Sequence, residues 1–188
     1  MPDTGAMEKP LDRDLDIFLD DVKAAPRDAG PVVSIILRPG DDLREVVDAG
    51  VLSVEDGLVG DAWRARGSRN MPDGSADPDA QLTLMSTRVL AAIEPDRSRW
   101  PLAGDQILVD MDLGVDNLPA GTRLTVGEAE VEVTPLPHTG CGKFSARFGS
   151  DALRWINRPE GRALRMRGMY VRVVRGGTIR VGDAVRKA

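Results

Sequence analysis

The chain has 188 residues and a net charge of −5 at pH 7. Its 41% of hydrophobic residues suffice for one domain with a mainly aliphatic core, because aromatic residues make up only 4%. No run of about 18 apolar residues occurs, and the N-terminus lacks the basic and apolar regions of a secretory signal, so we expect neither a membrane span nor a membrane partner. A single cysteine excludes an internal disulfide and fits a cytoplasmic location.

The first 30 residues are expected to form an arm ahead of a main domain that spans residues 31–188. Residues 1–10 are expected to be disordered. From residue 11 to residue 24, apolar side chains recur near helical spacing, which predicts an amphipathic helix that ends before Pro26. A helix packed on the main domain is a simpler interpretation than one that docks a partner.

The main domain alternates short strands with glycine and proline turns. Strand patterns occupy residues 31–38, 81–87, 105–110, 122–126, 128–134, 168–174 and 178–185. Residues 88–93 predict a short helix and residues 63–80 a long surface loop, whereas residues 43–54 fit either a helix or strand pieces. Many short strands with few helices are typical of a mostly β fold, and we expect a closed or nearly closed β-barrel.

Charge is distributed unevenly along the chain. Residues 141–188 carry 12 of the 25 Lys and Arg residues but 3 of the 30 Asp and Glu residues. Arginine suits phosphate and carboxylate groups, although a surface that pairs this basic part with the acidic remainder explains most of these arginines equally well. We expect no nucleic-acid partner, because the whole chain is acidic and shows neither a helix-turn-helix nor an alternation of aromatic and basic residues.

The segment from residue 138 to residue 149 contains the only histidine and the only cysteine of the chain, His138 and Cys141. Glycine flanks the cysteine on both sides, so a ligand can approach the thiol closely. A helix is expected over residues 143–157, with a break at Gly149. Its N-terminus, two following cations and a protonated His138 would favour the thiolate. The alternative is a small buried hydrophobic cysteine, which the glycines and cations disfavour.

A thiolate at this position supports three chemistries. It attacks a carbonyl with His138 as the base, it accepts sulfur as a persulfide, or it binds a soft transition metal. A hydrolase also needs a group that orients the histidine, and either Asn117 or Asn157 is a candidate. One cysteine and one histidine do not form a zinc site without several carboxylates.

The segment around Cys141 resembles the signature of the MOSC domain (molybdenum cofactor sulfurase C-terminal domain). The resemblance rests on His138-Thr-Gly-Cys141 followed by Lys143-Phe144 and Arg147-Phe148-Gly149. It extends over about residues 31–187 through further pieces at Gly57-Leu58-Val59-Gly60-Asp61, Asn117-Leu118-Pro119-Ala120-Gly121, Arg167-Gly168-Met169-Tyr170-Val171 and Gly177 to Asp183.

The resemblance implies a mostly β barrel of the MOSC or pyruvate-kinase barrel-like type, with a few short helices. It also implies a pocket that binds molybdenum cofactor (molybdopterin), with Cys141 as the metal ligand and with Cys141 and His138 as catalytic residues. The residues expected to hold the anionic cofactor are Lys143, Arg147, Asn117, Asp61 and Arg66. Either Arg66 or Arg64, both in the long loop, is expected to close over it.

Two functions follow from the resemblance. One is the reduction of N-hydroxylated compounds, which needs a separate redox partner because the chain has no ferredoxin-like extension with clustered cysteines. The other is a sulfur relay or cofactor-binding module without turnover, supplied by a separate cysteine desulfurase. Both place a small-molecule ligand at Cys141, and the sequence does not distinguish between them.

Overall fold

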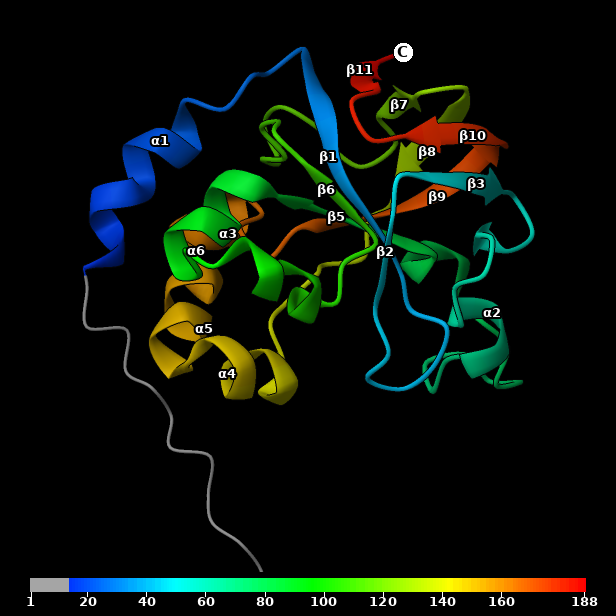
Figure 1. Cartoon of the computed structure of the whole chain (residues 1–188), viewed down its shortest axis with the longest axis horizontal. Helices are drawn as coiled ribbons and strands as arrows, with labels where there is room; N and C mark the ends of the chain where they lie inside the picture. Colours follow the sequence, from blue (N-terminus) through cyan, green and yellow to red (C-terminus); the bar gives the residue numbers. More distant parts are fainter. Residues whose placement is uncertain (1–13) are drawn as a thin grey trace, which may run out of the picture.

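The computed structural model describes residues 14–188. The disorder expected over residues 1–10 and the first positions of the helix expected from residue 11 lie outside this part. The chain forms a β-barrel with short helices packed against one side and a smaller sheet on the other (Figure 1). The expected barrel is confirmed, but the described residues form more helices than the sequence predicts.

Seven strands close the barrel in the order β1, β11, β7, β8, β9, β5, β6 and back to β1. All neighbours are antiparallel except β5 and β6, which are parallel. Their bounds are β1 Ala29–Leu37, β5 Leu82–Ser86, β6 Ile107–Val109, β7 Arg123–Val126, β8 Ala129–Val133, β9 Met169–Arg175 and β11 Ala184–Lys187. Strand β1 completes the ring because it pairs with β11 at its start and with β6 farther along.

The strand expected over residues 178–185 is wrong, because a turn divides it between two sheets. Gly182 has a φ of 92°, which glycine adopts without the strain that a Cβ would cause. Before the turn, β10 (Gly177–Arg180) joins β3 (Ala49–Ser53) and β4 (Gly57–Leu58) in a small separate sheet. The ambiguous segment 43–54 therefore forms strands, namely β3 and β2 (Glu45–Val47), which extends β1.

Helices cover one side of the barrel (Figure 1). They are α3 (Thr87–Ile93), α4 (Gly142–Phe148), α5 (Ser150–Asn157), α6 (Pro159–Ala163) and the 3-10 helix η3 (Arg97–Ala103). The break at Gly149 is confirmed, with a φ of 91° between α4 and α5. The expected loop 63–80 is partly wrong, since α2 (Trp63–Arg66) and the 3-10 helix η2 (Pro78–Ala80) lie within it. Trp63 is buried and anchors α2.

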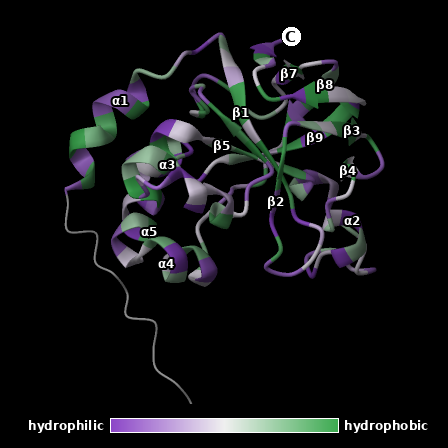
Figure 2. Cartoon of the chain, viewed as in Figure 1, coloured by the Kyte–Doolittle hydropathy of each residue, from purple (hydrophilic) through white to green (hydrophobic). Residues whose placement is uncertain are grey.

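The barrel strands separate two hydrophobic cores. Alternate residues point inward, so Ala129, Val131 and Val133 of β8 pack inside the barrel while Glu130 and Glu132 pair with surface arginines. Residues on the outer face of the helix-covered strands enter the second core. In Figure 2 the strands are mostly hydrophobic, whereas α4 and α5 alternate hydrophobic and hydrophilic residues.

The N-terminal arm packs on the helical layer. It consists of the 3-10 helix η1 (Leu15–Phe18) and α1 (Leu19–Lys23), and it buries Leu15 and Val22 in the second core. Asp16 accepts a hydrogen bond of 2.9 Å from the Trp155 indole of α5. None of the helices within residues 14–188 combines the length and the apolar character needed to cross a bilayer.

Candidate active site at one end of the barrel

One end of the barrel contains a polar cavity of about 190 Å³. Residues at the ends of four barrel strands line it: Arg38 follows β1, Gly104 precedes β6, His138 follows β8, and Arg167 precedes β9. Further lining residues include Trp63, Arg66, Ser68, Asp77, Thr83 and Tyr170. Three arginines and one aspartate, Asp77, are among the lining residues, so guanidinium donors that suit an anion predominate.

Asp61 fixes the position of Arg38. Its fully buried carboxylate accepts hydrogen bonds from Arg38 N at 3.1 Å, Nε at 2.8 Å and Nη2 at 3.0 Å. The remaining nitrogen, Nη1, donates to the Gly104 carbonyl at 2.9 Å. Asp61 is expected from the sequence to bind the cofactor, but it lies behind Arg38 and is not one of the described residues that line the cavity.

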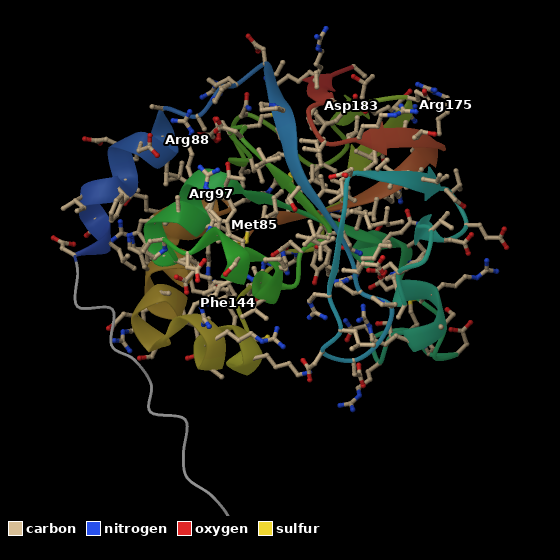
Figure 3. The ribbon with its side chains drawn as sticks, viewed as in Figure 1. Met85, Arg88, Arg97, Phe144, Arg175 and Asp183 are labelled. Carbon is tan, nitrogen blue, oxygen red and sulfur yellow. The ribbon has the colours of Figure 1, made fainter. Side chains whose placement is uncertain are left out.

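A buried ion pair between Arg167 and Asp105 forms the inner wall. Arg167 Nη1 lies 2.7 Å from Asp105 Oδ2, and Nη2 donates to the Ala103 carbonyl at 3.0 Å. The Arg167 guanidinium also lies 4.9 Å from the Phe144 ring of α4. Figure 3 shows the Phe144 and Met85 side chains between α4 and the barrel. Burial raises the pKa of Asp105, and the charge of Arg167 opposes that rise.

His138 lines the cavity in its neutral form. Its side chain is 9% exposed, its ring centroid lies 4.4 Å from that of Tyr170, and Nδ1 is 3.7 Å from Asp105 Oδ1. Burial, followed by the charges of Arg167 and Arg38, holds the pKa of His138 well below 6.5. The expectation that a protonated His138 stabilises the thiolate is therefore wrong, because both burial and these cations disfavour the imidazolium.

Cys141 is exposed at the start of α4, which excludes the interpretation that it is a buried hydrophobic residue. It is the N-cap residue, in extended backbone, and its side chain makes no capping hydrogen bond. Gly140 packs so closely on Leu153 of α5 that a side chain there would collide with it, whereas a Cβ at Gly142 would meet no atom within 4 Å. The backbone just before Cys141 therefore packs against α5, whereas the space beside Gly142 is open.

Lys143 and Arg147 face a carboxylate outside the cavity. Lys143 Nζ lies 3.4 Å and Arg147 Nη2 lies 2.6 Å from Asp42 Oδ1. Arg147 also donates to the Leu102 carbonyl at 2.8 Å. Both are expected from the sequence to bind the cofactor, yet neither is among the residues between 14 and 188 that line the cavity.

Asn117 lies at the opposite end of the barrel. Its amide nitrogen donates to the carbonyls of Arg27 at 2.9 Å and Asp112 at 2.8 Å, and its oxygen accepts from Lys187 at 2.7 Å. These contacts join the chain before β1, the loop after β6 and the last residue of β11. The amide is thus occupied by structural contacts far from the cavity that His138 lines.

Arg66 is the expected cofactor-binding residue that does line the cavity. It is exposed, and no carboxylate within the described residues forms an ion pair with it, so its charge is available to a ligand. Its neighbour on α2, Arg64, instead pairs with Glu55 at 2.7 Å and Asp56 at 2.9 Å. Of the two arginines expected to close over the ligand, Arg66 has the better placement.

The chain offers one thiol rather than a complete metal site. Within residues 14–188, no group of three or more His, Cys, Asp and Glu side chains is arranged to hold a metal ion. A metal at Cys141 would therefore need most of its ligands from a cofactor. Sequence reasoning did not assign Arg38, Asp105, Arg167 and Tyr170 to the site. Arg167 and Tyr170 lie in a segment that resembles the family signature, whereas Arg38 and Asp105 had no signal beyond their place in strand-forming segments.

The sequence and the fold were compared with those of known proteins. The family model described as MOSC domain matches residues 71–186, which is more than half of the chain. A search of curated proteins returned no match. The solved structures with a similar fold include the YiiM protein from Geobacillus stearothermophilus, with 17% identity, a TM-score of 0.59 and coverage of 85% of this chain and 75% of that one.

Two further structures have the same fold. YiiM from Escherichia coli is 21% identical with a TM-score of 0.56, and the alignment covers 85% of this chain and 69% of that one. The YuaD protein from Bacillus subtilis is 14% identical with a TM-score of 0.55, covering 84% of this chain and 94% of that one. At these identities the likeness establishes the fold alone.

Proposed function

Because the chain belongs to the MOSC domain family, we propose that it binds molybdenum cofactor or carries sulfur through Cys141. The observation that carries the proposal is an exposed thiol, the only one in the chain, on the same short segment as a histidine of the arginine-lined cavity, although Cys141 itself is not among the described residues that line it. His138, three residues before Cys141, lines that cavity. A free thiol also fits the reducing cytoplasm, which we propose as its location.

The side chains at this barrel end fit the chemistry of such a cofactor in two respects. A cysteine sulfur is a soft ligand that suits molybdenum, and the guanidinium groups of Arg38, Arg66 and Arg167 suit its anionic group. The cavity, at about 190 Å³, is smaller than the roughly 300 Å³ or more of a typical organic ligand pocket. It therefore fits one anionic group, with the remainder of a cofactor outside it.

The roles of the protein groups follow from their positions. Arg38 and Arg167 are held rigidly by buried carboxylates and orient the anion, while Arg66 approaches from α2. Neutral His138 accepts or donates a hydrogen bond inside the cavity. Bound molybdenum would supply two-electron chemistry beside the sulfur. In the reductase alternative, a redox partner supplies the two electrons and solvent supplies two protons, so that the N–O bond of an N-hydroxylated compound breaks and leaves an N–H group and water.

The relay alternative rests on the exposure of Cys141. An accessible thiol accepts a sulfur atom from a cysteine desulfurase as a persulfide without any metal. Lys143 and Arg147, which follow Cys141 on α4 and pair with Asp42, then face the partner rather than the cofactor. In that case the protein delivers sulfur to the assembly of a metal–sulfur cofactor and has no turnover of its own.

The test is the composition of the protein purified from a host that makes molybdenum cofactor. Molybdenum and pterin near one equivalent, with reduction of an N-hydroxylated compound by an artificial electron donor, support the reductase. A persulfide on Cys141 after incubation with a desulfurase and cysteine, without molybdenum, supports the relay. Background molybdenum together with an unmodified thiol contradicts the proposal.

We expect Arg66→Ala to weaken the binding of inorganic phosphate by about tenfold, the effect of losing one charge-assisted hydrogen bond. Isothermal titration calorimetry measures the affinity. The matched control is Arg64→Ala, which removes the same charge from the same helix but from a residue paired with Glu55 and Asp56. Equal losses in the two variants would show that long-range charge, rather than contact in the cavity, controls binding.

A further inference from the structure

Three buried polar atoms at the inner wall of the cavity have no hydrogen-bond partner among the described residues, namely His138 Nδ1, Asp105 Oδ1 and Arg167 Nε. The histidine nitrogen and the aspartate oxygen lie 3.7 Å apart. The Asp105 side chain is fully buried and that of His138 is 9% exposed. Buried polar atoms are almost always paired, because an unpaired one costs about 1–3 kcal/mol. Two unpaired atoms facing each other therefore require a common explanation.

The geometry favours a hydrogen bond between His138 Nδ1 and Asp105 Oδ1. Asp105 Oδ2 is occupied by Arg167 Nη1 at 2.7 Å, so Oδ1 is the free lone-pair acceptor. The imidazole is held against the Tyr170 ring, and the charges that face it, Arg167 and Arg38, disfavour a second proton on the ring. A movement of about 1 Å brings Nδ1 and Oδ1 to a normal hydrogen-bond distance.

We propose that Asp105 is a positioning residue that accepts the Nδ1–H of His138 and thereby leaves Nε2 as a bare hydrogen-bond acceptor of the cavity. A neutral imidazole carries one proton, so a proton fixed on Nδ1 cannot also be on Nε2. The same logic applies where a carboxylate sets the tautomer of a catalytic or metal-binding histidine. The inference rests on the proposed function only in taking the cavity as the ligand site.

This arrangement specifies the class of ligand. Arg66, which forms no ion pair within the described residues, and the guanidinium donors of Arg38 and Arg167 favour an anion, and a bare imidazole nitrogen favours an N–H or O–H donor on the same ligand. The cavity therefore selects small anions that carry a proton over anions of the same shape and charge that carry none. Near pH 7.5, inorganic phosphate is mainly a dianion with one O–H, whereas sulfate is a dianion without a donor. We expect phosphate to bind at least about tenfold more tightly than sulfate.

The chain has only one histidine, so its proton can be located without assignment. Proton–nitrogen correlation spectra of the untagged, ¹⁵N-labelled protein distinguish a proton on Nδ1 from one on Nε2. We expect Nδ1–H in the parent protein. In Asp105→Asn, the amide oxygen keeps Arg167 and the amide N–H faces Nδ1. The proton then moves to Nε2, and the preference changes from phosphate to sulfate.

The control variant is Asp110→Asn, which neutralises a carboxylate paired with Arg88 at the opposite end of β6. It is expected to leave both the tautomer and the anion preference unchanged. A proton on Nε2 in the parent, an unmoved proton in Asp105→Asn, or no preference for phosphate would overturn the inference. If Asp105→Asn does not fold, the tautomer of His138 in the parent protein still tests the inference. That measurement is independent of molybdenum content, on which the proposed function depends.

Discussion

Cys141→Ser is expected to lose all molybdenum retention and all persulfide formation while remaining at least as stable as the parent. Serine cannot form a persulfide and is a hard, weak ligand for molybdenum. Position 141 is the N-cap of α4, where the cysteine makes no capping hydrogen bond. Serine is a preferred N-cap residue and contributes about 0.5–1 kcal/mol at such a site. Metal analysis and chemical denaturation of the same preparation measure the two effects.

A serine-to-alanine change on the same helix provides the comparison. Ser145→Ala alters the same helix, one turn after the thiol, and is expected to leave metal and sulfur unchanged. If Cys141→Ser retains molybdenum at the parent level and shows no loss of reductase activity, the metal does not depend on this sulfur. The use of cysteine where serine would stabilise the helix is itself an argument for a chemical role.

Arg167→Met is expected to lower the free energy of unfolding by about 3–5 kcal/mol, the usual cost of breaking a buried ion pair on one side. Arg167 is 8% exposed, and its removal leaves the fully buried Asp105 carboxylate without a counter-charge. It also removes the cation held over the Phe144 ring, which anchors the helix that presents Cys141. Urea denaturation gives the free energy of unfolding, provided that the slope of this free energy against urea concentration is the same in the variant and the parent.

The matched control is Arg172→Met on β9, where the arginine is half exposed and pairs with Glu132 and Asp79. Surface pairs contribute at most about 1 kcal/mol, so this variant should unfold nearly as the parent does. The double variant Arg167→Met with Asp105→Leu should recover most of the lost stability, because no buried charge remains. A small effect of Arg167→Met alone would show that Asp105 is neutral in the folded protein.

Features set by neighbouring residues could be predicted from the sequence. The break between α4 and α5 follows from Gly149, whose φ of 91° few other residues adopt. The hairpin of β7 and β8 follows from strict alternation, with Val131 inside the barrel and Glu130 outside it. Gly182 carried the same kind of signal, but alternation continued across it and concealed the turn.

The cavity depends on contacts between distant segments, and local patterns do not reveal these. Asp105 and Arg167 lie far apart in the sequence and meet only because β5 joins β6 to β9 in the barrel. The same limit explains why Lys143 and Arg147 were predicted as ligand-binding residues. Nothing in their own segment shows that Asp42, on a loop after β1, faces both of them.

The pairing of β1 with β11, from Ala29↔Arg186 to Pro31↔Ala184, has a consequence for synthesis of the protein. On the ribosome, β1 and β7 both emerge before β11, and each lacks this neighbour until β11 has been translated. Such edges attract other strands and favour aggregation. Barrel closure is therefore a late event, and nascent chains interrupted before residue 184 should depend on chaperones that shield open strands.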